Sequence, residues 1–191
     1  MPALCELDDV LLTPRLALIA LPGPVIEDVL REGRQAFREH VGVDYPPEWP
    51  SESGHVLQLR RDQIRDGDDH RWLIRAAVRR AQPAMIGRVG FHAPPDASGV
   101  VEIGYEIDAR HRRQGYGLEC ATHMIRCAEQ LGCVSAIRAS IAPDNEPSLR
   151  MAERLGFRRI GEQIDEIDGL EFVFEREAPS GHDGRPAQPR S

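Results

Sequence analysis

The chain has 191 residues, of which 41% are hydrophobic and 29% are charged, and its net charge is −7 at pH 7. This length and composition fit one globular domain with a core of its own. The acidic balance argues against broad binding to nucleic acid or anionic membranes. The N-terminus lacks the basic start of a secretory signal, and no apolar run could span a bilayer. We therefore expect a cytoplasmic protein without nucleic-acid or membrane partners.

Strand and helix signals alternate through the first part of the chain. Residues 15–21 are predicted to form a strand, and a Pro-Gly-Pro break separates them from one or two helices over residues 24–41. A loop rich in proline and aromatic residues covers residues 45–50. Ser51 then caps a predicted helix over residues 52–65, whose apolar positions fall near one face.

The middle of the chain is predicted to form an antiparallel meander. Three segments carry strand patterns and are joined by turns: residues 72–81, 85–92 and 100–107. A long amphipathic helix over residues 115–131 follows, ends at Gly132, and leads into a strand over residues 134–141. A strand, a helix and a strand in succession imply a parallel crossover, so the strands at 100–107 and 134–141 should lie side by side.

The last predicted elements are a short helix and a hairpin. Asn145 or Asp144 can cap a helix that runs to Leu155. Residues 157–167 and 171–176 are predicted as two strands that close a hairpin around an Asp-Gly pair. A terminal strand of this kind is a candidate sheet edge, and edges can pair across a two-fold axis, so a homodimer is one expectation.

These elements define one domain. Residues 1–177 contain all the periodic segments, whereas residues 178–191 are rich in Gly, Pro and Ser and are predicted to be a flexible tail.

The spacing of the cysteines matches neither a structural zinc site nor a redox motif, and they are expected to be reduced thiols: Cys5, Cys120, Cys127 and Cys133. The seven histidines include no HExxH pair, so no metal site is predicted.

The most informative segment is RRQGYG at residues 112–117, which joins a predicted strand to the long helix. The first amides of a helix lack intrahelical partners and lie at the positive end of its dipole, so they favour anions. Gly115 and Gly117 allow the backbone to approach a ligand closely. The position and residues of this turn do not fit a dinucleotide fingerprint or a Walker loop. The segment therefore predicts a pyrophosphate-binding turn at the start of the helix that is neither a dinucleotide fingerprint nor a Walker loop.

This turn and its flanks resemble the GNAT superfamily, the acyl-coenzyme A-dependent N-acyltransferases. RRQGYG is similar to the Arg/Gln-x-x-Gly-x-Gly/Ala signature, EIGYEID at 102–108 resembles the central strand, and APDNEPSLRMAERLGF at 142–157 resembles the Asn-x-x-Ser helix of that superfamily. The resemblance covers residues 15–176 and looks closest to the branch that contains the ribosomal-protein N-terminal alanine acetyltransferases. It implies an α+β fold with a mixed, mostly antiparallel sheet, a parallel strand pair splayed at the coenzyme site, and helices on both faces.

The resemblance implies acetyl-CoA as cosubstrate and assigns residues to it. Backbone amides of the turn would bind the pyrophosphate, and Arg112 would add positive charge; the amides are those of Arg113, Gln114, Gly115, Tyr116 and Gly117. The pantetheine arm would pair with the strand end at Ile107 and Asp108, and Asn145 would hydrogen-bond it from the other side. Simpler roles are a solvated basic turn for the arginines and a helix cap for Asn145.

The reaction implied is direct attack of an amine on a thioester, which requires a base to deprotonate an alkylammonium. Glu102 and Glu106 are the candidates, because strand alternation places both on one face unless a bulge intervenes. We favour Glu102 slightly as the base, since desolvation inside a strand can raise a carboxylate pKa, and take Glu106 as an orienting group. A surface ion pair is an equally good account of either glutamate alone.

The remaining steps need a polarised carbonyl and a protonated thiolate. A strand amide near Ile107 would form a one-donor oxyanion site. Many members of the superfamily place a tyrosine acid where this chain has Ala152. Ser148 lies one helical turn from both Asn145 and Ala152 and is the substitute candidate, although a first-turn helix residue needs no such role.

The acceptor is expected to be a primary amine, either a protein N-terminus or a small molecule. Acidic and aromatic residues suited to a cationic amine lie between the first strands, although packing explains the aromatic ones equally well: Asp44, Tyr45, Glu48, Trp49 and Glu52. An arginine near the pocket would favour a dicarboxylic acyl group such as succinyl, and the candidates are Arg75, Arg79 and Arg88. The alternative from another class is a non-catalytic acyl-CoA-binding sensor or interaction module.

Overall fold

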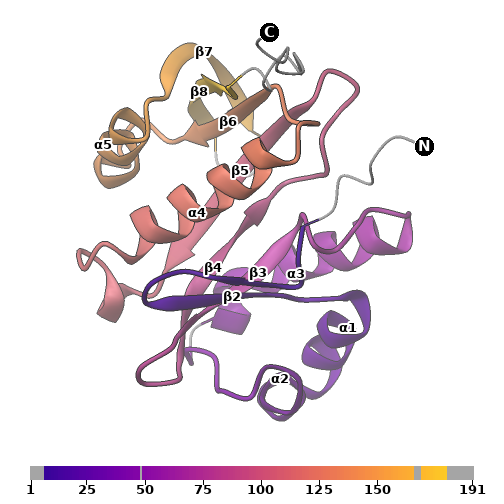
Figure 1. Ribbon diagram of the computed structural model, residues 1–191. Coiled ribbons are helices and arrows are strands. Elements are labelled where there is room, and N and C mark those ends of the chain that lie inside the picture. Colours follow the sequence, from indigo (N-terminus) through magenta and orange to yellow (C-terminus); the bar gives the residue numbers. More distant parts are fainter. Residues whose placement is uncertain (1–6, 48, 166–168, 180–191) are drawn as a thin grey trace, which may run out of the picture.

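The computed structural model describes residues 7–47, 49–165 and 169–179 and contains one eight-stranded sheet in the order β1-β2-β3-β4-β5-β6-β8-β7 (Figure 1). The strands are β1 (Val10–Leu12), β2 (Leu16–Ala20), β3 (Ile74–Arg79), β4 (Met85–Phe91), β5 (Val100–Ile107), β6 (Ala136–Ile141), β7 (Arg158–Asp165) and β8 (Gly169–Glu177). All neighbouring strands pair antiparallel except β5 and β6, which are parallel. This confirms the predicted mixed, mostly antiparallel sheet with one parallel pair.

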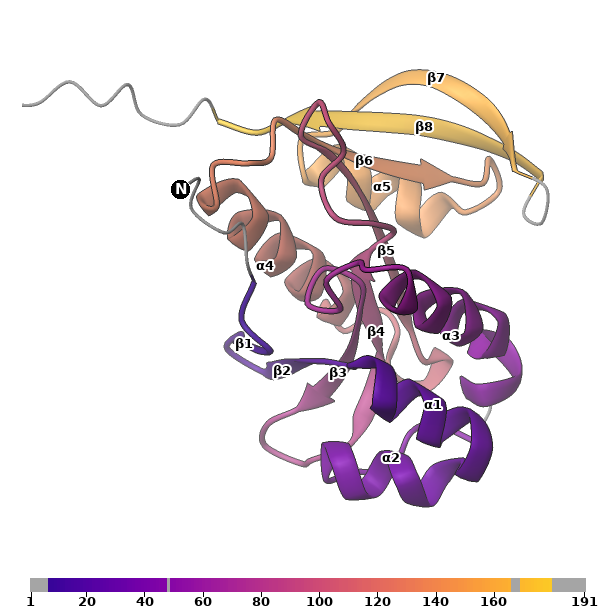
Figure 2. The same cartoon turned by 90° about the vertical axis from the view of Figure 1, so that its right-hand side faces the viewer.

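Helices cover both faces of the sheet, as predicted. The helical elements are α1 (Gly23–Glu32), α2 (Arg34–Val41), α3 (Trp49–Arg65), the 3-10 turn η1 (Ala109–His111), α4 (Tyr116–Gln130) and α5 (Glu146–Arg154). Helices α1, α2 and α3 share one apolar cluster with β3 residues such as Ala76, whereas α4 and α5 share the other with Ala77. Successive strand residues point to opposite faces, so these clusters lie on opposite sides of the sheet. Figure 2 shows α4 and α3 on opposite sides accordingly.

The parallel pair is joined only at its beginning. Its register runs from Val100 opposite Ala136 to Glu102 opposite Arg138, and no pairing between β5 and β6 continues beyond that point. The second half of β5 therefore separates from β6, as the family resemblance implied. Figure 1 shows α4 and α5 at this side of the sheet, one leading out of β5 and the other out of β6.

Several predicted boundaries differ from the structure. The strand β1 was not predicted, because three residues carry too little pattern and it forms by pairing with β2. Helix α3 begins at Trp49, inside the predicted proline-aromatic loop.

Cys133 is disulfide-bonded, which corrects the expectation of a reduced thiol there. The centre of the predicted hairpin turn and most of the predicted tail lie outside the described residues.

The strand predicted at 171–176 is not an edge. It belongs to β8, which pairs with β6 on one side and with β7 on the other. A later strand can insert between earlier ones without any local sequence signal, because the insertion depends on long-range pairing. The edges of the sheet are β1 and β7 instead, so the argument for dimerisation through residues 171–176 is wrong.

Candidate functional site

The segment between β5 and α4 is a sequence of tight, internally bonded turns. Asp108 accepts a hydrogen bond from the amide of Arg110 at 3.0 Å and caps η1. Arg113 and Gly115 take positive φ values of 59° and 81°, which turn the chain into the first residues of α4. Gly115 is the N-cap of α4, and with no side chain it leaves the first amides of the helix uncapped. The predicted anion-binding turn is thus followed directly by an open helix N-terminus.

Two side chains of the turn bond back to the protein. Arg112 Nε donates to the carbonyl oxygen of Ile107 at 2.7 Å, and Gln114 Nε2 donates to the carbonyl oxygen of Arg110 at 3.3 Å. The pKa of Asp108 falls to about 2, first because Arg110 donates hydrogen bonds to its carboxylate. Asp108 is therefore an anion that stabilises the turn through its side chain, and only its backbone is suited to the predicted contact with pantetheine.

Arg15, from the loop between β1 and β2, supports the turn from outside. Its Nε lies 2.6 Å from Glu119 Oε2 and its Nη1 donates to the carbonyl oxygen of Gln114 at 3.0 Å. Its guanidinium also lies 4.3 Å from the centre of the Tyr116 ring. Burial of Glu119 acts to raise its pKa, but hydrogen bonds from Thr13 and Arg15 outweigh burial and lower it. No local sequence signal points to Arg15, because its contact with Glu119 spans 104 residues.

Glu102 and Glu106 share one face of β5, and the register between β4 and β5 contains no bulge that would change the alternation. Glu106 Oε2 accepts a hydrogen bond from Arg88 Nε at 3.0 Å and is held in an ion pair. Glu102 Oε1 instead lies 3.6 Å from His92 Nδ1, and Glu102 is the last β5 residue paired with β6. The two carboxylates therefore have different partners, and only Glu102 lies where the strands begin to separate.

The opposite face of β5 contributes Tyr105 to the region between the parallel strands. Burial raises the pKa of Tyr105, and the nearby side chain of Ser148, on α5, opposes the rise. Asn145 Oδ1 accepts a hydrogen bond from the Ser148 amide at 3.3 Å, so Asn145 does cap α5. Ala152 is buried in the core. Tyr105 was not predicted as a site residue, because strand alternation places it among apolar neighbours.

Backbone amides of β5 face the gap between the separated strands. The Asp108 amide donates to Ile86 and the Glu102 carbonyl accepts from His92, so even-numbered residues of this segment point toward β4. Backbone groups alternate along a strand, which directs the amides of Tyr105 and Ile107 toward β6 and hence into the gap. Ile107 is thus oriented as the predicted oxyanion donor would need to be.

Residues predicted to border the acceptor lie on the α3 side of the sheet, but most are committed to packing or ion pairs. Phe37, Tyr45 and Trp49 form a buried cluster with ring centres 5.1 to 5.4 Å apart. Asp44 is ion-paired with Arg38. Trp49 and Arg88 line a small hollow, together with Pro46, Gly87, Glu106 and Asp108. Glu48 and the side chain of Glu52 lie outside the described residues.

The three arginines proposed as acyl selectors have separate environments. Arg75 is completely buried and donates to the carbonyl oxygens of Asp9 and Arg71, so it cannot reach an acyl group. Nε of Arg79 is buried without a hydrogen-bond partner among the described residues. Arg88 is the one that lies beside the hollow, and it is paired with Glu106.

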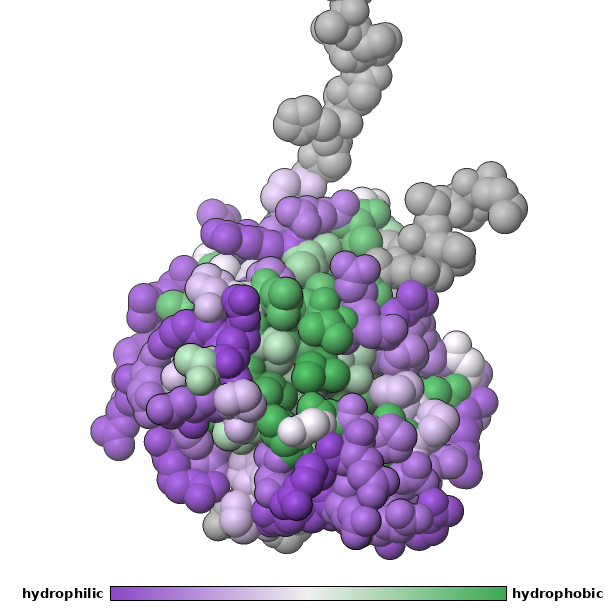
Figure 3. Space-filling view, turned by 60° about the horizontal axis from the view of Figure 1, so that its bottom comes forward, coloured by the Kyte–Doolittle hydropathy of each residue, from purple (hydrophilic) through white to green (hydrophobic). Residues whose placement is uncertain are grey.

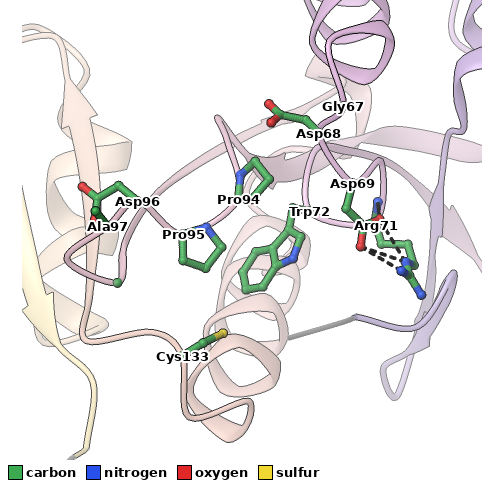
Figure 4. Close-up of a pocket in the computed structure, with 11 residues that line it drawn as sticks. Gly67, Asp68, Asp69, Arg71, Trp72, Pro94, Pro95, Asp96, Ala97 and Cys133 are labelled. Atoms are coloured by element: carbon green, nitrogen blue, oxygen red, sulfur yellow. Dashed lines mark hydrogen bonds and ion pairs between the residues drawn. The ribbon is translucent and has the colours of Figure 1, made fainter. Parts of the chain in front are cut away.

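A larger hollow of about 730 Å³ lies at the other end of β5, among the loops that precede β3 and β5 (Figure 4). Its three acidic groups are already bonded: Asp68 to Gln63, Asp69 to Arg71, and Asp96 to the amides of Ser98 and Val100. This hollow lies at the opposite end of the strand from residues 108–117, and it is therefore separate from the predicted coenzyme turn.

The surface seen from below Figure 1 carries a band of hydrophobic residues between hydrophilic margins (Figure 3). Contiguous apolar surface of this kind is typical of ligand grooves and interfaces. Among the described residues, no group of three His, Cys, Asp or Glu side chains could hold a metal ion, and no helix is long and apolar enough to cross a bilayer.

Comparison with known proteins gives a consistent result. The family model of the acetyltransferase (GNAT) domain matches residues 26–158. The chain is 31% identical over 150 residues to the uncharacterized N-acetyltransferase YjdG of Bacillus subtilis (strain 168), which covers 76% of this chain and 87% of that protein.

Solved structures share the fold at lower identity. The microcin C7 self immunity acetyltransferase MccE, in complex with acetyl-CoA and AMP, is similar with a TM-score of 0.61 and 17% identity over 86% of this chain and 93% of that chain. The ribosomal-protein-S5-alanine acetyltransferase from Vibrio fischeri has a TM-score of 0.59 and 14% identity over 94% and 100% of the two chains. The separated parallel strands, the turn at the start of α4 and the matched family model together confirm that this chain belongs to the GNAT family of acetyltransferases.

Proposed function

We propose that this protein transfers the acetyl group of acetyl-CoA to a primary amine, by direct attack of the amine on the thioester. The observation that carries the proposal is the separation of β5 from β6 after Glu102, beside the uncapped N-terminus of α4. A gap with inward-facing amides suits an extended pantetheine arm, and an open helix N-terminus suits a pyrophosphate. MccE, which shares the fold, was solved with acetyl-CoA.

The coenzyme would be held mainly by backbone groups. In this proposal the amides of residues 113–117 bind the pyrophosphate, and the Ile107 amide polarises the thioester carbonyl as the oxyanion donor. Support comes from the uncapped first turn of α4 and from the direction of the Ile107 amide, which points away from β4. Arg112 contributes positive charge while its Nε stays bonded to the Ile107 carbonyl.

Proton removal from the amine would occur on the opposite face of β5, around Glu102. Glu106 is less suited to be the base, because Arg88 donates a hydrogen bond to its carboxylate and stabilises the charged form. Among the residues that the structure describes, no arginine donates a hydrogen bond to Glu102, whose carboxylate lies near His92 instead, and Glu102 lies where β5 begins to separate from β6. We assign Glu102 as the carboxylate that supports deprotonation, either directly or through a neighbouring group.

Protonation of the departing thiolate would fall to the pair formed by Ser148 and Tyr105. The Ser148 side chain acts on Tyr105, which pairs a residue of α5 with one of β5, whereas the family resemblance expects a tyrosine at Ala152. Because a thiol ionises at about pH 8.5, the thiolate is a fair leaving group near neutral pH. The pair would therefore assist the reaction without being indispensable.

Titration calorimetry with acetyl-CoA, followed by measurement of thiol release with a panel of amines and N-terminal peptides, tests the proposal. We expect saturable binding and amine-dependent release of CoA. Binding without release from any amine would favour a sensor of acyl-CoA over a transferase, and absence of binding would contradict the assignment of residues 112–117.

A further inference from the structure

His92, the residue that follows β4, lies on the same face of the sheet as the two glutamates. Its amide donates to the Glu102 carbonyl at 2.8 Å, and its ring Nδ1 lies 3.6 Å from Glu102 Oε1. Its Nε2 lies only 2.8 Å from the position that a Cβ atom on Gly104 would take. The ring therefore occupies the space above Gly104, with one nitrogen toward Glu102 and the other over the strand segment that has separated from β6.

The backbone of His92 is held from helix α3. Arg60 Nη1 and Gln63 Nε2 both donate to the His92 carbonyl oxygen, at 2.6 and 2.8 Å. Arg60 is buried, and burial lowers its pKa to about 10, a value at which it is still a cation at neutral pH. The exposed fraction of the His92 side chain is nevertheless 50%, so the residue is held through its backbone while its ring remains accessible to a ligand.

The charges around the ring favour its neutral form. Burial is the largest effect and lowers the pKa of His92 below its ordinary value; the cations Arg60 of α3 and Arg88 of β4 lower it further. Glu102 of β5 and Asp165 of β7 act in the opposite direction but do not reverse the shift. A neutral imidazole has one nitrogen lone pair available, and a carboxylate near Nδ1 favours the tautomer with that lone pair on Nε2.

We propose that, in the transfer reaction inferred above, His92 Nε2 is the general base that takes the proton from the acceptor amine, and that Glu102 is a positioning residue acting on Nδ1. The inference rests on the proposed function. The 3.6 Å contact is longer than a hydrogen bond, so Glu102 acts on the ring through its charge at this distance, and contacts of this kind tighten when a substrate displaces water.

The reaction balances with groups that the chain provides. The alkylammonium first loses one proton to solvent; the neutral amine nitrogen then forms a bond to the acetyl carbon, the bond between that carbon and the CoA sulfur breaks, and a second proton of the nitrogen moves to His92 Nε2. The CoA thiolate leaves and is protonated by the Ser148 and Tyr105 pair or by solvent. His92 then returns its proton to solvent, since half of its side-chain surface is accessible.

The test compares pH profiles of kcat/KM for wild type, His92→Gln and Glu102→Gln, with an amine that supports turnover. We expect the wild-type rate to fall on the acid side with an apparent pKa below 6.5, and His92→Gln to abolish that limb and lower kcat about 100-fold or more. Glu102→Gln should keep the limb but move it to lower pH, because the charge that raises the pKa of His92 is gone. Acetyl-CoA affinity by calorimetry should be unchanged in both variants.

A second readout does not depend on turnover. The imidazole proton and nitrogen resonances of His92 should titrate below 6.5 in the wild-type protein and at still lower pH in Glu102→Gln. His123→Gln is the matched control variant. His123 also has a pKa lowered by burial, but it lies on α4, across the sheet, so its substitution should leave the titration of His92 unchanged.

Three outcomes would overturn the assignment. The first is an acid limb that survives in His92→Gln, and the second is one that disappears in Glu102→Gln, which would make Glu102 the base. The third is titration of His92 at or above its ordinary pKa. Absence of thiol release from wild type with every amine would instead contradict the proposed function itself.

Discussion

Arg15 Nε lies 2.6 Å from Glu119 Oε2, and this pair connects the loop before β2 to the first turn of α4. The Arg15 amide and the Thr13 hydroxyl also donate to Glu119 Oε1, at 2.8 and 2.6 Å. Glu119 is thereby fixed by three donors beside the turn proposed to bind pyrophosphate. The start of α4 is thus positioned by a segment about a hundred residues earlier in the chain.

We expect Arg15→Ala to raise the Kd for acetyl-CoA about 10-fold while changing kcat less, because the turn at Gln114 loses a donor and Tyr116 loses its cation contact. Titration calorimetry measures the Kd directly. Arg31→Ala is a matched control, since Arg31 forms an exposed ion pair on α1. An unchanged Kd in Arg15→Ala would show that the turn does not need this support.

Gly117→Glu should abolish acetyl-CoA binding without unfolding the protein. A Cβ atom at Gly117 would meet Ile107, Met151 and Tyr105 at 3.6 to 3.9 Å, which is ordinary van der Waals contact, but a carboxylate at the start of α4 would repel a phosphate. Gly117→Ala is the control for size and should bind. Thermal unfolding checks the fold of both variants, and retained binding in Gly117→Glu would contradict the pyrophosphate site.

Substitution of each of the two glutamates of β5 should change a different kinetic parameter. Glu102→Gln is expected to lower kcat about 10-fold or more, because it removes the carboxylate that supports deprotonation. Glu106→Gln should mainly change the KM for the amine, since its carboxylate is bound to Arg88 beside the small hollow. Steady-state kinetics with the same amine give both parameters, and equal effects of the two substitutions would contradict this division.

Removal of the hydroxyl groups between β5 and α5 should have a modest effect. We expect Ser148→Ala and Tyr105→Phe each to lower kcat less than about 10-fold, because a CoA thiolate leaves readily without a strong acid. The double variant should lose no more than the sum, in free energy, of the single variants if the two hydroxyl groups act as one unit. A loss of turnover of about 1000-fold in either single variant would instead make that residue an indispensable acid.

Asp108 should make stability depend on pH in acid. Its pKa in the folded protein is lowered to about 2, so its stabilising effect is fully present above the unfolded value near 3.9 and is lost as pH falls from there toward 2. With an allowance for solvent screening we expect about 1 kcal/mol. Urea unfolding of wild type and Asp108→Asn at pH 6 and pH 3 measures it, and the difference between the two proteins should shrink at the lower pH.

Local patterns were sufficient for much of the fold. The parallel crossover over β5, α4 and β6 follows from a strand, an amphipathic helix and a strand in succession, and residues 112–117 stood out because glycine and a helix start have local signals. The face shared by Glu102 and Glu106 also follows from alternation alone. These features depend on interactions between residues close in sequence, which a single sequence displays directly.

Other features depend on which distant segments meet. The three-residue β1 and the position of β8 inside the sheet come from strand pairing, and Arg15 reaches Glu119 across 104 residues. His92 has no motif of its own, and its place beside Glu102 is set by the register of β4 against β5. The sequence by itself determined the family, the order of elements and the anion-binding turn, whereas only the tertiary structure decided which side chains face each carboxylate, because register and burial are properties of packing between segments far apart in the chain.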